Sequence, residues 1–180
     1  SLNGMRGMLA DSTNESAGLP GSINSILASG RSFTAFAVEK RSGLQGSVAG
    51  VGRYSNSVVL GGADYWSLCF DGSSRRFFMY CYSGYSYADS GFSFTDDAPY
   101  AIAWRVNAAG GFRCNFNGQV TDQPSAGLLI PSSQEGAVYV NFQRGAGTNR
   151  GYEYIVTRDV LADDVMDTAV LALKGKWAIA

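Results

Sequence analysis

The chain has 180 residues, of which 46% are apolar and only 16% are charged, and its formal net charge is −1. This length suits one domain that buries its own core. A net charge this close to zero gives no indication of a nucleic-acid partner, and no apolar run is long enough to predict membrane insertion. The sequence contains no histidine, which excludes Ser-His-Asp triads, Cys-His pairs and zinc sites with histidine ligands.

The chain divides into two parts by composition. Residues 1–30 are rich in Gly, Ser and Asn, and they predict an N-terminal arm with one edge strand or a short turn. Residues 31–180 are predicted to form one β-sandwich domain, because short apolar runs alternate there with Gly-rich turns. The predicted strands cover residues 33–38, 47–52, 57–62, 66–70, 76–82, 100–106, 112–118, 137–143 and 151–158.

The aromatic stretch RRFFMYCYSGYSYADSGFSF, residues 75–94, contains the second strand of a predicted hairpin. A two-residue type II′ turn would place Leu68 opposite Phe77. Alternation then divides this strand between a core face and an outer face. The core face receives Phe77, Met79 and Cys81. The outer face receives Phe78, Tyr80 and Tyr82, and the loop that follows is predicted to carry Tyr85 and Tyr87.

A second hairpin is predicted from residues 100–106 and 112–118, with Val106 opposite Phe112. This register places Arg105 directly opposite Arg113 on the outer face, which is unfavourable for two like charges. Three explanations are open: a carboxylate or solvent between the arginines, a bulge that changes the register, or a bound anion. We favour a carboxylate or solvent.

Helical spacing replaces the strand pattern in residues 161–173, where apolar residues recur at every third or fourth position. Asp163, Asp164 and Asp167 lie toward the N-terminus of this segment, where the helix dipole favours negative charge. Gly175 is predicted to end the helix. The sequence therefore predicts an all-β domain with one short C-terminal helix.

Three stretches resemble concanavalin A-like, laminin-G-like jelly-roll domains of the bacterial and phage type. They are FTAFAV, YAIAWRVNAAGGFRCNFNGQ and GYEYIVTRDVLADDVMDTAVLALKGKWAI. The resemblance spans residues 31–180 and implies two antiparallel sheets packed face to face. The family pattern has Ser or Thr where this sequence has Ala162, so the helix is expected to lack that cap, with Asp159 as a substitute. Members frequently bind saccharides, whereas others are structural modules.

No catalytic or metal site is predicted. Hydrolases of this fold use paired carboxylates on one strand, and the four glutamates are too scattered for that. Glu153 is predicted to be a hydrogen-bonding strand residue. Aspartates at the rim loops could hold Ca²⁺, but their spacing is not that of a calcium loop. No cofactor is therefore predicted. The glutamates are Glu15, Glu39, Glu135 and Glu153.

Glycan recognition is the function that these features favour, because aromatic faces and polar side chains together suit sugars. The prediction is a non-catalytic carbohydrate-binding or adhesion domain, at an extracellular or virion-surface location, with a glycan or polysaccharide as partner. The candidate ligand-binding residues are Tyr80, Tyr82, Tyr85, Tyr87, Arg105, Arg113 and Asn115.

The alternative is a structural or assembly domain of a phage virion, such as a tail fibre, head fibre or capsid decoration. Its aromatic face would pack against a neighbouring subunit, since Tyr is enriched in interfaces. The partners would then be copies in a homo-oligomer or other virion proteins. A polysaccharide hydrolase or lyase that combines Glu153 with a distant aspartate is the third hypothesis.

Overall fold

The computed structural model describes residues 8–10, 15–18, 32–45, 49–54, 66–71, 76–81, 86–128, 137–143, 146–157 and 159–180. In this part of the chain, no helix has the length and apolar character needed to cross a membrane.

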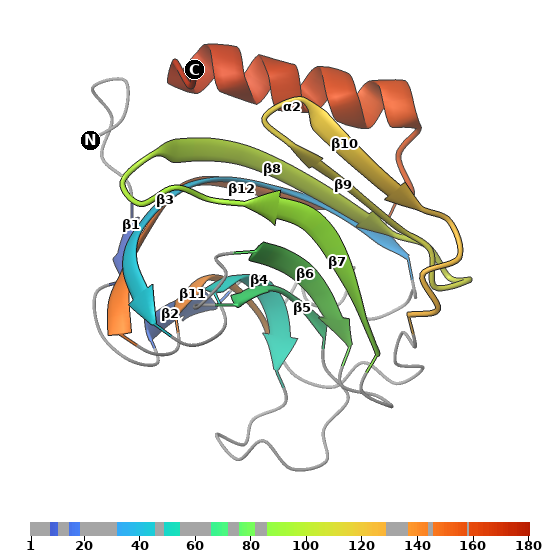
Figure 1. Ribbon diagram of the computed structural model, residues 1–180, viewed down its shortest axis with the longest axis horizontal. Coiled ribbons are helices and arrows are strands. Elements are labelled where there is room, and N and C mark those ends of the chain that lie inside the picture. Colours follow the sequence, from blue (N-terminus) through green and yellow to red (C-terminus); the bar gives the residue numbers. More distant parts are fainter. Residues whose placement is uncertain are drawn as a thin grey trace.

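Two antiparallel sheets, each with six described strands, pack face to face (Figure 1). The first sheet has the order β1 (Met8–Ala10), β12 (Ala146–Thr157), β3 (Phe33–Gln45), β8 (Pro99–Val106), β9 (Phe112–Phe116) and β10 (Gln119–Gln123). The second has the order β2 (Glu15–Gly18), β11 (Ala137–Gln143), β4 (Ala49–Tyr54), β5 (Trp66–Asp71), β6 (Arg76–Cys81) and β7 (Ser86–Ser93). Helix α2 (Asp163–Trp177) lies along the outer face of the first sheet (Figure 1). The predicted all-β sandwich with a C-terminal helix is confirmed.

The predicted N-terminal arm contributes an edge strand to each sheet. Strand β1 pairs with β12, and β2 pairs with β11. The sequence predicted one edge strand or a turn in this region. Strands of three and four residues are too short to show a periodic apolar pattern.

The sequence prediction misses two strands, β7 and β10. Strand β7 was expected to be a loop because its buried positions, Ala88 and Ser90, hold small residues rather than large apolar ones. Strand β10 is a polar edge strand, QVTDQ, with no apolar alternation. The strand predicted at 57–62 lies outside the described residues.

The two predicted hairpins differ in how well their register was foreseen. Strands β8 and β9 pair as predicted, with Val106 opposite Phe112 and Arg105 opposite Arg113. Strands β5 and β6 instead pair Leu68 with Met79, a shift of two residues from the prediction. A shift of two leaves each residue on its predicted face, and Phe77 is fully buried as expected. The predicted type II′ turn is wrong, because Asp71 pairs with Arg76 and the connection is longer than two residues.

The β9–β10 hairpin turns at Asn117 and Gly118, which both have positive φ, 53° and 94°. Two central residues with positive φ define a type I′ turn, whose twist matches the flanking strands. The Asn117 side chain also accepts a hydrogen bond from the Ala101 amide at 2.9 Å. This turn therefore ties β9 and β10 to β8.

Two apolar layers hold the fold together. Between the sheets, the Phe77 ring of β6 contacts three aromatic rings, with centroids 5.3–5.7 Å away; these belong to Phe94, Tyr100 and Phe116. The other layer lies between the first sheet and α2. It contains Phe36, Val38, Ala101 and Ala103 from the sheet and Met166, Val170, Leu173 and Trp177 from the helix.

A buried polar cluster of Glu39, Arg41, Tyr100 and Tyr154 lies at the edge of the inter-sheet core. The Tyr100 and Tyr154 hydroxyls each donate to the Glu39 carboxylate at 2.7 Å, and Arg41 is ion-paired with Glu39. Burial alone would lower the pKa of Arg41, but the charge and hydrogen bond of Glu39, together with Tyr100 and Tyr154, outweigh burial and raise that pKa. Since a buried charge without its partner is strongly destabilising, the four side chains fix one another.

Gly151 tests the packing around this cluster. A methyl group at Gly151 would overlap the ring of Tyr154, which is held by Glu39. We expect Gly151→Ala to lower the free energy of unfolding by about 1–3 kcal/mol, measured by urea denaturation. The matched control is Gly175→Ala in α2, where an added methyl group meets no atom within 4 Å. That variant should be neutral or stabilising by up to about 1 kcal/mol. Equal losses in both variants would contradict the steric argument.

Candidate functional site

The predicted site residues are divided between the two sheets. Arg105 on β8 and Arg113 and Asn115 on β9 belong to the first sheet and lie toward α2. Tyr80 on β6 and Tyr87 on β7 belong to the second sheet. Tyr82 and Tyr85 lie outside the described residues. The structure therefore does not bring the predicted set together, and it defines two surfaces that must be considered separately.

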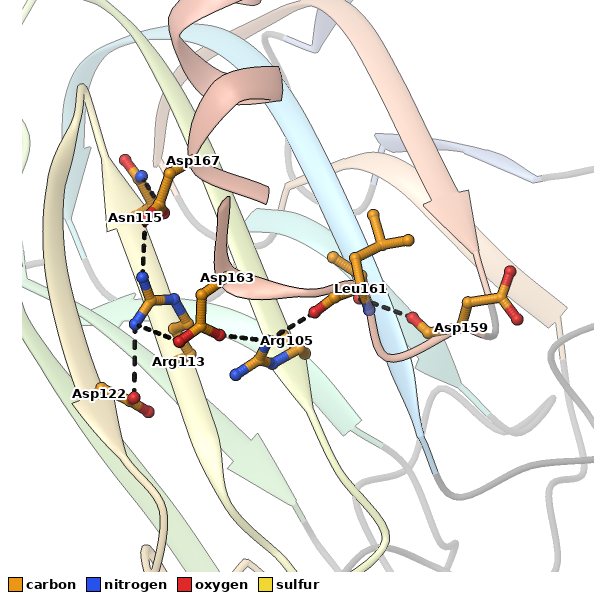
Figure 2. Close-up of polar contacts among 9 residues, drawn as sticks. Arg105, Arg113, Asn115, Asp122, Asp159, Leu161, Asp163 and Asp167 are labelled. Atoms are coloured by element: carbon orange, nitrogen blue, oxygen red, sulfur yellow. Dashed lines mark hydrogen bonds and ion pairs between the residues drawn. The ribbon is translucent and has the colours of Figure 1, made fainter. Parts of the chain in front are cut away.

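The outer face of the first sheet is covered by α2, and we call it the helix-covered face. There the Asp163 carboxylate lies between the two facing arginines (Figure 2). One Asp163 oxygen is 2.6 Å from Arg105 Nη1, and the other is 3.5 Å from Arg113 Nη1. Of the explanations left open for this like-charged pair, a carboxylate is confirmed.

Further contacts extend this pair into a network that anchors α2. Arg113 Nη2 lies 2.8 Å from Asp167 Oδ2, and the Asn115 amide donates to Asp167 Oδ1 at 2.7 Å. Arg113 also contacts Asp122 of β10 at 3.4 Å. We call Arg105, Arg113, Asn115, Asp122, Asp163 and Asp167 the helix-anchoring network (Figure 2).

The helix-anchoring network changes the interpretation of three predicted ligand-binding residues. Arg105, Arg113 and Asn115 were expected to be outward donors for a glycan. Arg113 and Asn115 are buried, and each of the three has donors engaged by protein acceptors on or beside α2. The reason is that an outward polar position looks the same in sequence whether solvent or an acidic helix covers it.

The N-terminus of α2 lacks a side-chain cap at Ala162, as expected. The expected substitute, an Asp159 cap, is not present either. Instead, Thr34 of β3 fixes this turn: its hydroxyl donates to the Asp159 carbonyl at 2.7 Å and accepts from the Leu161 amide at 3.2 Å. The segment that precedes the helix is therefore held by strand β3 of the first sheet.

The C-terminus of α2 lies beyond the predicted stop. The helix passes through Gly175 to Trp177, so the prediction that Gly175 ends it is wrong. Ala178 adopts the left-handed conformation instead, and its amide donates to the Gly175 carbonyl at 3.3 Å. These last residues of the helix are held by Glu153 of β12, which accepts hydrogen bonds from Lys176 and Trp177.

Glu153 has the structural role that its sequence context predicted. Its carboxylate accepts hydrogen bonds from Lys176 at 2.8 Å and from the Trp177 indole at 2.6 Å. Partial burial acts to raise the pKa of Glu153, but the two hydrogen bonds and the Lys176 charge outweigh it and lower that pKa. A general acid needs a raised pKa, so this carboxylate gives no support to a hydrolase. Within the described residues, no group of three His, Cys, Asp or Glu side chains could hold a metal ion.

The outer face of the second sheet has a different character, and we call it the open face. On β7, Ala88 and Ser90 are buried, whereas 65% of the Tyr87 surface is exposed. Because side chains alternate along a strand, Tyr87 and Asp89 lie on the face directed away from the first sheet. Tyr80 pairs with Tyr87 across the β6–β7 ladder, so its position is on the same face. Tyr87 is therefore in a strand, not in the loop that was predicted.

Side chains from β10 hold the free edge of β7. The Thr121 hydroxyl donates to the Ser90 carbonyl, and the Gln123 amide donates to the Asp89 carbonyl, both at 2.6 Å. These bonds occupy backbone acceptors that an edge strand otherwise leaves unpaired. The strand that carries Tyr87 is thus fixed on both sides.

No protein-family model and no curated protein matches this sequence. Solved structures are similar in fold. The CBM40 module of a Ruminococcus gnavus IT-sialidase, bound to α2,3-sialyllactose, has a TM-score of 0.66 at 12% identity, and the match covers 92% of this chain and 100% of the module. The botulinum neurotoxin serotype D binding domain has a TM-score of 0.66 at 10% identity, with 92% of this chain and 42% of that one covered.

A Trypanosoma rangeli sialidase in complex with 2,3-difluorosialic acid has a TM-score of 0.64 at 11% identity, and the match covers 97% of this chain and 28% of the sialidase. At such low identities these likenesses show the fold alone. They give no support to the phage alternative, and the laminin-G-like assignment stays a prediction.

The helix-anchoring network yields a stability prediction. Asp167→Ala removes the acceptor of both Arg113 and Asn115, and leaves the buried Arg113 with only longer contacts to Asp122 and Asp163. We expect the free energy of unfolding to fall by about 2–4 kcal/mol, measured by denaturant titration. The control is Asp164→Ala, at an exposed position in the same turn, which should change stability by about 0.5 kcal/mol or less. Similar losses in both would show that the network contributes little.

Glu153 yields a pH-dependent prediction. Its pKa in the folded protein is below the ordinary value of 4.5. It therefore contributes stability that is present above pH 4.5 and is lost as the pH falls through the folded-state pKa. We expect Glu153→Gln to lower the free energy of unfolding by about 1 kcal/mol at pH 7, and the difference from wild type to shrink below pH 4.5. A difference that stays constant from pH 7 to pH 3 would contradict this role.

Proposed function

We propose that this chain is a carbohydrate-binding domain that recognises glycans without cleaving them, in an extracellular setting, and that sialylated glycans are the first class to test. The observation that carries the proposal is the match with the CBM40 module, because it covers that module completely and nearly all of this chain. The same Ruminococcus gnavus module was also solved with α2,6-sialyllactose. A whole-module correspondence supports a shared type of function better than a match to part of a larger enzyme does.

The open face supplies the chemistry that such a function needs. An exposed tyrosine offers a flat apolar ring for the C–H groups of a sugar and a hydroxyl for polar contacts. Asp89, on the same face as Tyr87, offers a carboxylate acceptor for sugar hydroxyls. The helix-covered face offers little, since α2 and its network occupy it. The proposal therefore assigns recognition to the second sheet.

The non-cleaving part of the proposal is supported by Glu153, whose carboxylate is engaged by Lys176 and Trp177. The sequence also lacks histidine, which removes the commonest general base. Binding without turnover is the behaviour that these features favour.

Calorimetric titration with α2,3-sialyllactose, α2,6-sialyllactose and lactose tests the proposal. We expect saturable binding of at least one of these, with no release of free sugar on prolonged incubation. Tyr87→Ala should weaken that binding by about tenfold, as expected for an exposed aromatic contact. The control is Leu171→Ala, at an exposed apolar residue of α2 on the other side of the sandwich, which should leave the affinity unchanged.

If the folded protein binds none of these sugars and nothing on a broad glycan array, the proposed function is wrong. Release of sugar that Glu153→Gln abolishes would favour the hydrolase hypothesis instead.

A further inference from the structure

A second pair of like charges lies on the outer face of the first sheet, where Lys40 of β3 pairs directly with Arg150 of β12. Strand β3 keeps regular pairing with β8 from Phe33 to Lys40, so Lys40 is on the same face as Val38, which packs against α2. Arg150 is opposite Lys40 and therefore lies on that face as well. Val38 pairs with Glu153, which holds the last residues of α2, so Lys40 and Arg150 lie past the end of the helix. We call these two residues the basic pair.

The basic pair raises the same difficulty as the two arginines of the helix-anchoring network, because like charges directly opposite each other repel. For those arginines, α2 supplies aspartates from its first turns. Lys40 lies six residues along β3 from Thr34, the partner of Arg105, which is a distance of about 20 Å. At this end, the last turn of α2 carries Lys174 and Lys176 instead of aspartates. The helix therefore brings no carboxylate to the basic pair.

Lys40 has one acidic neighbour, which is on the side away from Arg150. The Lys40 ammonium lies 3.4 Å from Asp97 Oδ1, and the other Asp97 oxygen accepts a hydrogen bond from the Ser42 hydroxyl at 3.1 Å. Asp97 precedes β8, and β8 lies on the opposite side of β3 from β12. This carboxylate therefore does not separate the two charges of the basic pair.

Arg150 has no acidic partner in the part of the chain that the structure describes, where its guanidinium forms no hydrogen bond or ion pair. Glu153, on the same strand, is engaged by Lys176 and Trp177. Burial raises the pKa of Tyr152, and the opposing effect of the Arg150 charge is smaller, so this phenol supplies no negative charge at neutral pH. A half-buried guanidinium thus faces a lysine without a counter-charge between them.

We propose that the basic pair binds an oxyanion, a carboxylate or sulfate group that is either a small ion or part of an acidic polysaccharide. An oxyanion between Lys40 and Arg150 offsets their repulsion, as Asp163 does for the arginines beneath α2. The planar guanidinium matches such a group with two parallel hydrogen bonds, and the ammonium adds a compact charge. The next pair on this face, Ser42 and Thr148, places hydroxyl-bearing residues beside the site. The site is on the first sheet, so it does not rest on the function proposed for the open face.

Titration with inorganic sulfate tests the site directly. The NMR signal of the Arg150 Nε–Hε group is followed while sodium sulfate replaces sodium chloride at constant ionic strength. We expect a saturable shift of this signal. Lys40→Gln should weaken sulfate binding by about tenfold, because it removes one charge-assisted contact. The matched control is Lys174→Gln, which removes a charge from the flank of α2 beside the β9–β10 turn and should change the affinity by about twofold or less.

A polymer series identifies the source of the oxyanion, since dextran, carboxymethyl-dextran and dextran sulfate share one backbone. Arg150→Glu places a carboxylate opposite Lys40. It should abolish binding of both charged polymers and raise the melting temperature, because an opposite-charge pair replaces a like-charge pair. Arg150→Gln, which adds no new charge, should also abolish this binding. Tyr87→Ala, on the second sheet, should leave it unchanged.

Each outcome decides the inference. A sulfate shift that does not saturate, or that Lys40→Gln and Lys174→Gln weaken equally, overturns it. Folded Arg150→Glu and Arg150→Gln proteins that bind sulfate as tightly as wild type also overturn it. Sulfate binding at the basic pair without polymer binding assigns the site to a small anion, and polymer binding that both Arg150 variants abolish assigns it to an acidic polysaccharide. Loss of glycan binding in Tyr87→Ala with sulfate binding intact shows that the two sites are separate, so either proposal can fail alone.

Discussion

The pairing of Arg105 with Arg113 across β8 and β9 is the constraint on which the rest of the arrangement depends. Two guanidinium groups directly opposite each other on a sheet repel, and neither can give up its charge. This repulsion is offset from α2, because Asp163 lies between both arginines and Asp167 pairs with Arg113. The position of the helix and the pairing of β8 with β9 thus depend on each other. Apolar contacts between α2 and the first sheet bury apolar surface. The ionic network specifies where along the sheet the first turn of the helix lies.

This constraint also determines the role of the polar residues that α2 covers on the outer face of the first sheet. Once α2 is anchored, these residues serve folding. On the second sheet, Tyr87 of β7 is largely exposed. Among the described residues, the part of the first sheet beneath the helix therefore serves the stability of the fold. The same residue types, arginine and asparagine at outward strand positions, would have marked a binding site in a protein without the helix.

The sequence predicted the features that depend on the local periodicity of apolar residues. Alternation gave the β8–β9 register residue by residue, and helical spacing located α2 near its N-terminus. It could not predict which residues face each other over long separations. Tyr139 belongs to the alternating run AVYVNFQ, yet its backbone pairing with Gly52 joins strands that are more than 80 residues apart in the sequence. Strand β7 was mistaken for a loop because its inward positions hold Ala88 and Ser90, whose burial has no apolar signature.

Ser90 also explains how the open face can be rigid at an edge of the sheet. Its hydroxyl donates to the Phe77 carbonyl at 2.6 Å and accepts from the Phe92 amide at 3.1 Å, while its carbonyl accepts from Thr121. One small buried residue thereby connects β7 to β6 on one side and to β10 on the other. A large apolar side chain at this position could pack but could not make these bonds. A strand fixed in this way loses little further freedom when a ligand binds, and preorganisation of this kind raises affinity without additional contacts. The residue that misled the sequence prediction is thus one that holds the strand of Tyr87 in place.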